Sequence, residues 1–86
     1  MNPRVKEVHF QSPHFLVLTF TNQEVRRFSF QMYTSFPVYR KLQNEAFARK
    51  AHCRNGTVAW DEMIDFDPDT LYLESEPISE EKVKMG

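Results

Sequence analysis

Glycine and cysteine are both scarce in this chain, and each scarcity excludes a class of site or fold. The 86 residues include two glycines and one cysteine. Gly56 and Gly86 alone cannot form the glycine-rich loop that cradles a phosphate group. The single Cys53 excludes a disulfide within the chain, which favours a reducing compartment. We therefore expect neither a phosphate-binding loop nor a disulfide-stapled fold.

Long apolar runs are also missing from the sequence. No run approaches the about 18 apolar residues of a membrane span, and residues 1–7 lack the apolar segment of a signal peptide. We expect a cytoplasmic protein with no membrane partner. Eight phenylalanines and a hydrophobic fraction of 41% indicate a folded chain. The length predicts one domain at residues 1–78, followed by a polar, frayed tail at residues 79–86.

Charge is distributed unevenly along the chain, although the net charge is only −1. Residues 1–55 carry nine basic and three acidic side chains, a net charge of +6. Residues 56–86 carry two lysines and nine acidic side chains, a net charge of −7. The acidic part either packs beside the basic part and neutralises it, or the two form opposed patches that steer partners. The pattern favours neutralisation and leaves both interpretations open.

Two hairpins organise the predicted fold, and the first turns at Asn22-Gln23. Residues 14–20 give the strongest strand signal, with apolar side chains on both faces. Such a strand is covered on both sides or forms a dimer surface. Residues 24–30 are predicted as its partner, and residues 4–10 as a first strand with a bulge. A two-residue turn would pair Phe15 with Phe30 and Val17 with Phe28.

The second predicted hairpin turns at Asn55-Gly56, which is a strong short-range signal for a tight turn. Its alignment pairs Cys53 with Val58 and Ala51 with Trp60 on one face, so Cys53 should lie in a core beside Trp60. From the two hairpins, the predicted core residues are Phe15, Val17, Phe28, Phe30, Cys53, Val58 and Trp60.

Short helices are predicted at three places, and residues 31–36 are predicted as a loop. Pro37 suits a first helical turn, and Asn44 suits the cap of a helix over residues 44–50. A third helix is expected to start at a capping group formed by Asp67, Pro68 and Asp69. These elements predict an α+β fold. A mainly antiparallel sheet of about five strands, built from the two hairpins, should carry one or two short helices on one face.

No catalytic or metal-binding pattern stands out, and we predict no enzyme activity and no cofactor. Four acidic residues resemble the ligand spacing of a calcium loop but lack the required glycine; they are Asp65, Asp67, Asp69 and Glu76. Helix capping explains Asp67 and Asp69 without a metal ion. The residues with ligand chemistry for zinc lie at spacings that no zinc motif uses; they are His9, His14, His52 and Cys53. Asp65 remains available for an ion pair with Arg26 or Arg27.

Basic residues supply the candidate interaction surface. The residues assigned to it are Arg26, Arg27, Arg40, Lys41, Arg49, Lys50 and Arg54. Tyr39 and Phe47 are interleaved with the basic residues of the stretch at residues 40–54, a pattern that can contact nucleic acid. Against this stand a sequence pI near 6.3 and the lack of a nucleic-acid motif, so a solvated helix face is the simpler interpretation.

Several stretches of the chain resemble a bacterial family known only as domain of unknown function 2442. The matching stretches are Pro3-Arg4-Val5, 16–20, 24–26, 55–60 and 64–72. The family usually has Asn-Gly in its first turn, where this chain has Asn22-Gln23, and a second Asn-Gly near Asp61-Glu62, which is absent here. The resemblance implies a small α+β fold without assigned catalytic residues. It also implies a paired gene arrangement like that of toxin–antitoxin systems.

We predict a non-enzymatic interaction module that works through a protein partner or through self-association. The basis is the run of apolar residues on both faces of 14–20 and the presence of sheet edges in a small protein. The alternative is a nucleic-acid accessory or regulatory protein that uses the basic stretch at residues 40–54. Longer relatives carry an appended helix-turn-helix domain, which we do not expect in a chain of 86 residues.

Overall fold

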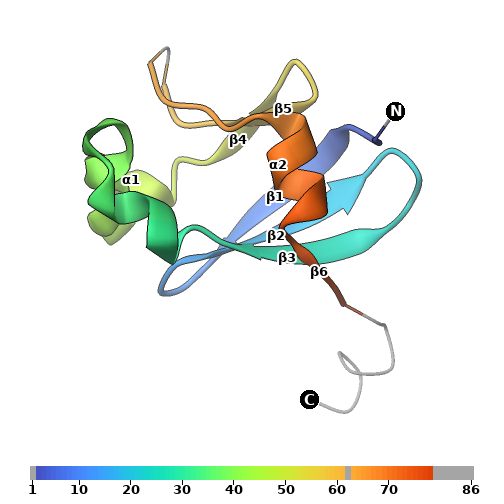
Figure 1. Ribbon diagram of the computed structural model, residues 1–86, viewed down its shortest axis with the longest axis horizontal. Helices are drawn as coiled ribbons and strands as arrows, with labels where there is room; N and C mark the ends of the chain where they lie inside the picture. Colours follow the sequence, from blue (N-terminus) through green and yellow to red (C-terminus); the bar gives the residue numbers. More distant parts are fainter. Residues whose placement is uncertain (1, 62, 79–86) are drawn as a thin grey trace.

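The computed structural model describes residues 2–61 and 63–78 and shows an α+β fold (Figure 1). Its main sheet is antiparallel, with strand order β1-β2-β3-β6, and a separate two-stranded sheet pairs β4 with β5. The strands are β1 (Val5–Gln11), β2 (Phe15–Phe20), β3 (Val25–Ser29), β4 (His52–Arg54), β5 (Thr57–Ala59) and β6 (Glu76–Pro77). The predicted fold class is confirmed. The strands divide between two sheets, and β6 is a strand that the sequence did not reveal.

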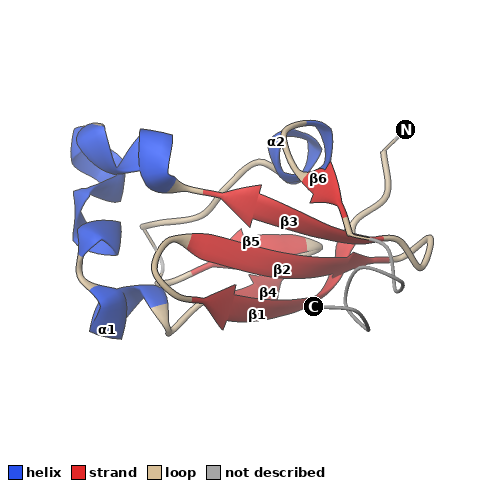
Figure 2. Cartoon of the chain, turned by 90° about the horizontal axis from the view of Figure 1, so that it is seen from below, coloured by secondary structure: helices blue, strands red, loops and turns tan. Residues whose placement is uncertain are grey.

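The helical segments are short. They are η1 (Gln31–Ser35), η2 (Pro37–Gln43), α1 (Glu45–Ala48) and α2 (Pro68–Leu73), where η denotes a 3-10 helix. Figure 2 shows the first three gathered at one end of the main sheet, while α2 lies beside β6. The prediction of a loop over residues 31–36 is wrong, because most of that segment is η1. Of the helices in the described residues, none is both long and apolar enough to cross a membrane.

The helix caps were predicted correctly. The Asp67 side chain accepts a hydrogen bond of 3.1 Å from the backbone N–H of Thr70, with Pro68 in the first turn of α2 and Asp69 beside it. The Asn44 side chain likewise accepts a bond from the N–H of Phe47 at the start of α1. Both caps satisfy backbone donors that have no partner inside the helix.

The register of the first hairpin differs from the prediction by one residue. Phe15 lies opposite Ser29, and Val17 lies opposite Arg27, where Phe30 and Phe28 were predicted. The cause is the turn. The Gln23 N–H donates to the Phe20 carbonyl, and Gln23 itself has a φ of 75°, so the loop has three residues instead of two. A turn followed by one left-handed residue is the usual form of a three-residue hairpin loop.

The shifted register changes which face of β2 is buried. Leu16, Leu18 and Phe20 are fully buried, whereas Phe15 and Val17 are only half-buried on the opposite face. The assignment of Phe15 and Val17 to the core is therefore wrong. A one-residue slip moves every side chain of a strand to the other face. Phe28 and Phe30 are buried as predicted, because they lie on the same face as Leu16.

The second hairpin has the predicted register, with Cys53 opposite Val58. Val58 and Trp60 are buried as predicted, but Cys53 is exposed, so its assignment to the core is wrong. The reason is the position of each strand. β5 has bonded neighbours on both edges, because the Phe66 N–H donates to the Val58 carbonyl, whereas β4 bonds only to β5. A strand at the border of a sheet keeps part of its surface in water.

Aromatic rings fill the space between the main sheet and the rest of the fold. Phe66 is their common neighbour and is buried. Its ring stacks on Tyr39 at 4.5 Å and meets Tyr33, Phe28 and Trp60 at 5.1 to 5.7 Å with their planes steeply inclined. This cluster joins β3, η1, η2 and the segment after β5 into one core. Aromatic pairs in these geometries contribute beyond their buried area.

Candidate interaction site

The border of β3 that faces β6 is only partly covered. β6 pairs with β3 at Arg26 and Arg27 and does not extend to Ser29. The Ile78 N–H donates to the Val25 carbonyl, so the odd-numbered residues of β3 direct their backbone groups toward β6. Ser29 follows the same alternation. Its N–H and C=O therefore point to an edge that β6 leaves open.

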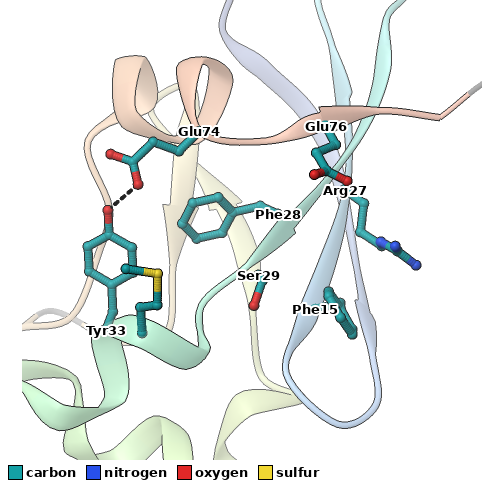
Figure 3. Close-up of a pocket in the computed structure, with 8 residues that line it drawn as sticks. Phe15, Arg27, Phe28, Ser29, Tyr33, Glu74 and Glu76 are labelled. Carbon is teal, nitrogen blue, oxygen red and sulfur yellow. Dashed lines mark hydrogen bonds between the residues drawn. The ribbon is translucent and has the colours of Figure 1, made fainter.

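A pocket of about 230 Å³ lies at this open edge (Figure 3). Its apolar wall consists of Phe15, Phe28, Met32 and Tyr33. Its polar lining consists of Ser29, Arg27, Glu74 and Glu76. Met32 is 83% exposed, so its side chain is accessible to a partner at the pocket. Together these residues offer apolar contact, two carboxylates and an unused strand edge.

The hydroxyl of Tyr33 donates a hydrogen bond to Glu74 across the mouth of the pocket, as Figure 3 shows. This bond links η1 to the C-terminal end of α2. The bond to Glu74 raises the pKa of Tyr33 to about 12, with a further contribution from burial. The hydroxyl therefore stays protonated at neutral pH and holds the Glu74 carboxylate at the pocket.

We expect the Glu74→Gln variant to lower the pKa of Tyr33 toward the ordinary value near 10. The stabilisation from this bond is complete below about pH 10 and is lost as pH rises through about 12, because the folded-state pKa is the raised one. Ultraviolet absorbance of the phenolate, followed from neutral to alkaline pH, measures the titration. Tyr33→Phe identifies the transition, since it removes the group. An unchanged titration in Glu74→Gln would contradict the assignment.

Arg26 fixes the start of β6 from the core side of the sheet. Its side chain is 14% exposed and forms an ion pair of 3.0 Å with Glu24. It donates to the Oγ and carbonyl of Ser75 at 2.8 and 2.6 Å, and its guanidinium lies over the ring of Tyr72. The Tyr72 hydroxyl bonds Glu24 and, with Asn22 and Arg26, lowers the pKa of that carboxyl. Arg26 therefore has a structural role, and its bonded guanidinium offers little free surface to a partner.

The other basic residues lie in three places. Arg27 lies on β3 with its guanidinium over Phe15, and Arg54 on β4 forms an ion pair with Asp65 at 3.7 Å. The partner of Asp65 is thus neither of the arginines predicted from the sequence. The remaining four belong to η2 or follow α1, at the helical end of the molecule; they are Arg40, Lys41, Arg49 and Lys50. The predicted nucleic-acid face depends on this last group.

The two oppositely charged parts of the sequence are joined at few points by ion pairs. Over residues 2–61 and 63–78, Arg54–Asp65 is the ion pair that connects them, while Arg26 and Arg49 pair with acidic residues of the basic part itself. Within the same ranges, no group of three or more His, Cys, Asp or Glu side chains could hold a metal ion. Carboxylates of the acidic part remain at the pocket, at Glu74 and Glu76.

Sequence reasoning missed most of the pocket. Ser29, Met32 and Tyr33 belong to a segment that had been interpreted as the end of a strand and a loop. Glu74 lies at the C-terminal cap of α2, and Glu76 was considered only as a calcium ligand. One local signal for β6 was available in the sequence. Glu74 and Glu76 alternate with Ser75 directly before Pro77, and prolines within sheets are confined mainly to strands at the border.

Comparison with known proteins identifies a family but no characterised relative. The family model described as "Protein of unknown function (DUF2442)" matches residues 5–77. The match covers both hairpins and the α2–β6 segment that borders the pocket. No curated protein matches the chain, and no solved structure matches it either.

Proposed function

The chain belongs to the DUF2442 family of proteins of unknown function, and we propose that it is a protein-interaction module that receives an extended segment of a partner beside β3. The observation that supports this most directly is the open backbone edge at Ser29, inside a pocket lined by apolar side chains, two carboxylates and Arg27. An extended peptide gains affinity from main-chain hydrogen bonds and specificity from pockets for alternate side chains. The proposal assigns no catalytic role to the domain.

The pocket defines the chemistry of the segment it would receive. The peptide backbone would bond the N–H and C=O of Ser29, in line with β6 and at the point where the chain enters the sheet from α2. An apolar side chain would pack on Phe28 and Met32. A lysine or arginine of the peptide would face Glu74 and Glu76, whose carboxylates lie at the rim.

The paired gene arrangement implied by the family resemblance supplies a first partner to test. The product of the neighbouring gene is the first candidate for the chain that carries the extended segment. All residues that line the pocket belong to the one described domain, so binding there would depend on this domain alone. The proposal thus extends to a role in a two-component, toxin–antitoxin-like system.

The test uses a displayed library of short random peptides, selected against the full chain. We expect enriched peptides to carry a basic residue next to an apolar one, and their addition should shift the NMR amide signals of Ser29 and Met32. Met32→Arg should weaken binding at least about tenfold, equivalent to about 1.4 kcal/mol, because it opposes a basic peptide. Met63→Arg is the matched control, since Met63 is 82% exposed and lies outside the pocket. Enriched peptides that shift other amides, or that tolerate Met32→Arg, would refute the proposal.

A further inference from the structure

The open edge of β3 beside the pocket is short, and it is closed at one end. Ser29 directs its N–H and C=O outward, beyond the point where β6 begins its pairing at Glu76. Residues 74–75 connect α2 to β6 there, as Figure 3 shows. Ser75 in this connection is buried and accepts hydrogen bonds from Arg26. A guest strand beside Ser29 therefore meets a fixed segment of the chain and cannot continue past it.

At its other end, the edge gives way to the helical part of the molecule. The N–H of Phe30 donates inward to the carbonyl of His14, and η1 begins at Gln31. The side of the pocket toward η1 is accessible, because Met32 there is 83% exposed. An internal segment of a partner needs room in both directions, whereas a chain terminus needs room in one. The pocket therefore fits a terminus of the partner chain.

Charge at the closed end decides which terminus fits. Of the two carboxylates there, Glu76 lies opposite Arg27 in the register and so has a basic neighbour. Glu74 accepts its hydrogen bond from the uncharged hydroxyl of Tyr33, and the ion pairs found in residues 2–61 and 63–78 do not include it. An amino terminus would place a positive charge at Glu74, whereas a terminal carboxylate would be repelled there.

We infer that the pocket receives the free amino terminus of its partner, with the α-ammonium group at Glu74 and the first three residues running parallel to β3. The inference rests on the proposed function and specifies the ligand of the same site. In a parallel pair, the carbonyl of the first guest residue accepts from the Ser29 N–H, and the N–H of the third donates to the Ser29 carbonyl. An antiparallel guest would instead bring its terminal carboxylate to Glu74.

The same alignment places the side chains of the guest. Its second residue lies beside Ser29 and shares the outer face of the sheet, where a basic side chain can reach Glu76. Its third residue shares the face of Phe28 and lies at the open end of the pocket, next to Met32. We therefore expect partners that begin with a free amino group, followed by a basic second residue and an apolar third residue.

The test compares four forms of one synthetic peptide, the one most enriched in the selection against the full chain. The first form has free termini, the second has an acetylated amino terminus, the third carries two additional glycines before its first residue, and the fourth has an amidated carboxyl terminus. Isothermal titration calorimetry gives the dissociation constants. We expect acetylation and the glycine extension each to weaken binding at least about tenfold, because both remove the ammonium group from Glu74. Amidation should leave the affinity unchanged.

Two variants of the chain assign the effect to one carboxylate. Glu74→Gln removes the charge but keeps an oxygen that can accept the hydrogen bond of Tyr33. With this variant, the free and acetylated peptides should bind within about threefold of each other. Glu76→Gln is the matched control and should retain most of the difference between the two peptides. Circular dichroism verifies that both variants are folded.

Equal affinities of the free and acetylated peptides for the unmodified chain would overturn the inference and leave the proposed function standing, because a peptide still binds at the pocket. A loss of affinity on amidation, with none on acetylation, would mean that a carboxyl terminus is bound instead. A preference for the free amino group that survives Glu74→Gln would also contradict the inference. A selection that enriches no peptide for the pocket would overturn the proposed function and the inference together.

Discussion

Replacing Leu18 by aspartate should leave the domain unfolded, whereas the same change at the neighbouring Val17 should leave it folded. Leu18 is fully buried against the core side of the main sheet. The variant loses the apolar contacts of a core leucine. It also buries a carboxylate opposite Arg26, whose guanidinium is already bonded to Glu24 and Ser75, so the new charge has no free partner. An uncompensated buried charge costs about 3–5 kcal/mol, and the loss of a core leucine has a similar cost. Small domains are stable by about 5–15 kcal/mol in total.

Val17 is the matched position because it lies one residue away on the opposite face. It is half-buried, and its cross-strand neighbours are His9 and Arg27. An aspartate at this position faces two basic groups, so we expect a change within about 1 kcal/mol. Urea unfolding followed by circular dichroism measures both variants. If Val17→Asp unfolded the chain and Leu18→Asp did not, the register of the first hairpin would be the one that the sequence alone suggested.

Replacing Phe66 by alanine should cost about 3–5 kcal/mol of unfolding free energy, the range for removing a buried aromatic side chain. Phe66 contacts four other aromatic rings, which come from β3, η1, η2 and the segment after β5. Its removal opens a cavity where these elements meet. They are short and cannot close around it without losing their own contacts.

Phe36→Ala is the control for the loss of a phenyl ring. Phe36 is 52% exposed and touches only the edge of the aromatic group, at 6.1 Å from Tyr33. We expect it to change the unfolding free energy by less than about 1 kcal/mol. Denaturant titrations of both variants, analysed with a common slope, give the comparison. Equal losses would mean that Phe66 is not the centre of the core.

Features that depend on a few adjacent residues could be predicted from the sequence. Asn55-Gly56 gave the correct alignment of the second hairpin, and Asp67 gave the start of α2, because turn and cap chemistry act over two to four residues. The first hairpin failed for a local reason as well. Gln23 adopts a left-handed conformation that is usually occupied by glycine or asparagine. Because a glutamine does not indicate this conformation, the three-residue loop could not be predicted from the turn residues.

The pocket could not be predicted because distant segments form it. β6 pairs with β3 across about fifty intervening residues, and two residues alone give no strand pattern. The exposure of Cys53 depends likewise on distant residues. The segment after β5 bonds to β5, so that β5 is the inner strand and β4, with Cys53, is the outer one. Alternation of apolar residues indicates that a strand exists, but long-range packing decides which of its edges and faces remain open.

The separation between β3 and β6 also orders the events of folding. β1, β2 and β3 follow one another along the chain, so their pairing closes short loops at little entropic cost. We expect the pairing of Arg27 with Glu76 to form later, because it closes a long loop that contains the intervening helices and the second sheet. Contacts that close late and involve few residues are also the first to open locally in the native state. Transient release of β6 would lengthen the free border of β3 from Ser29 back to Val25, which would admit a longer guest strand than the resting molecule allows.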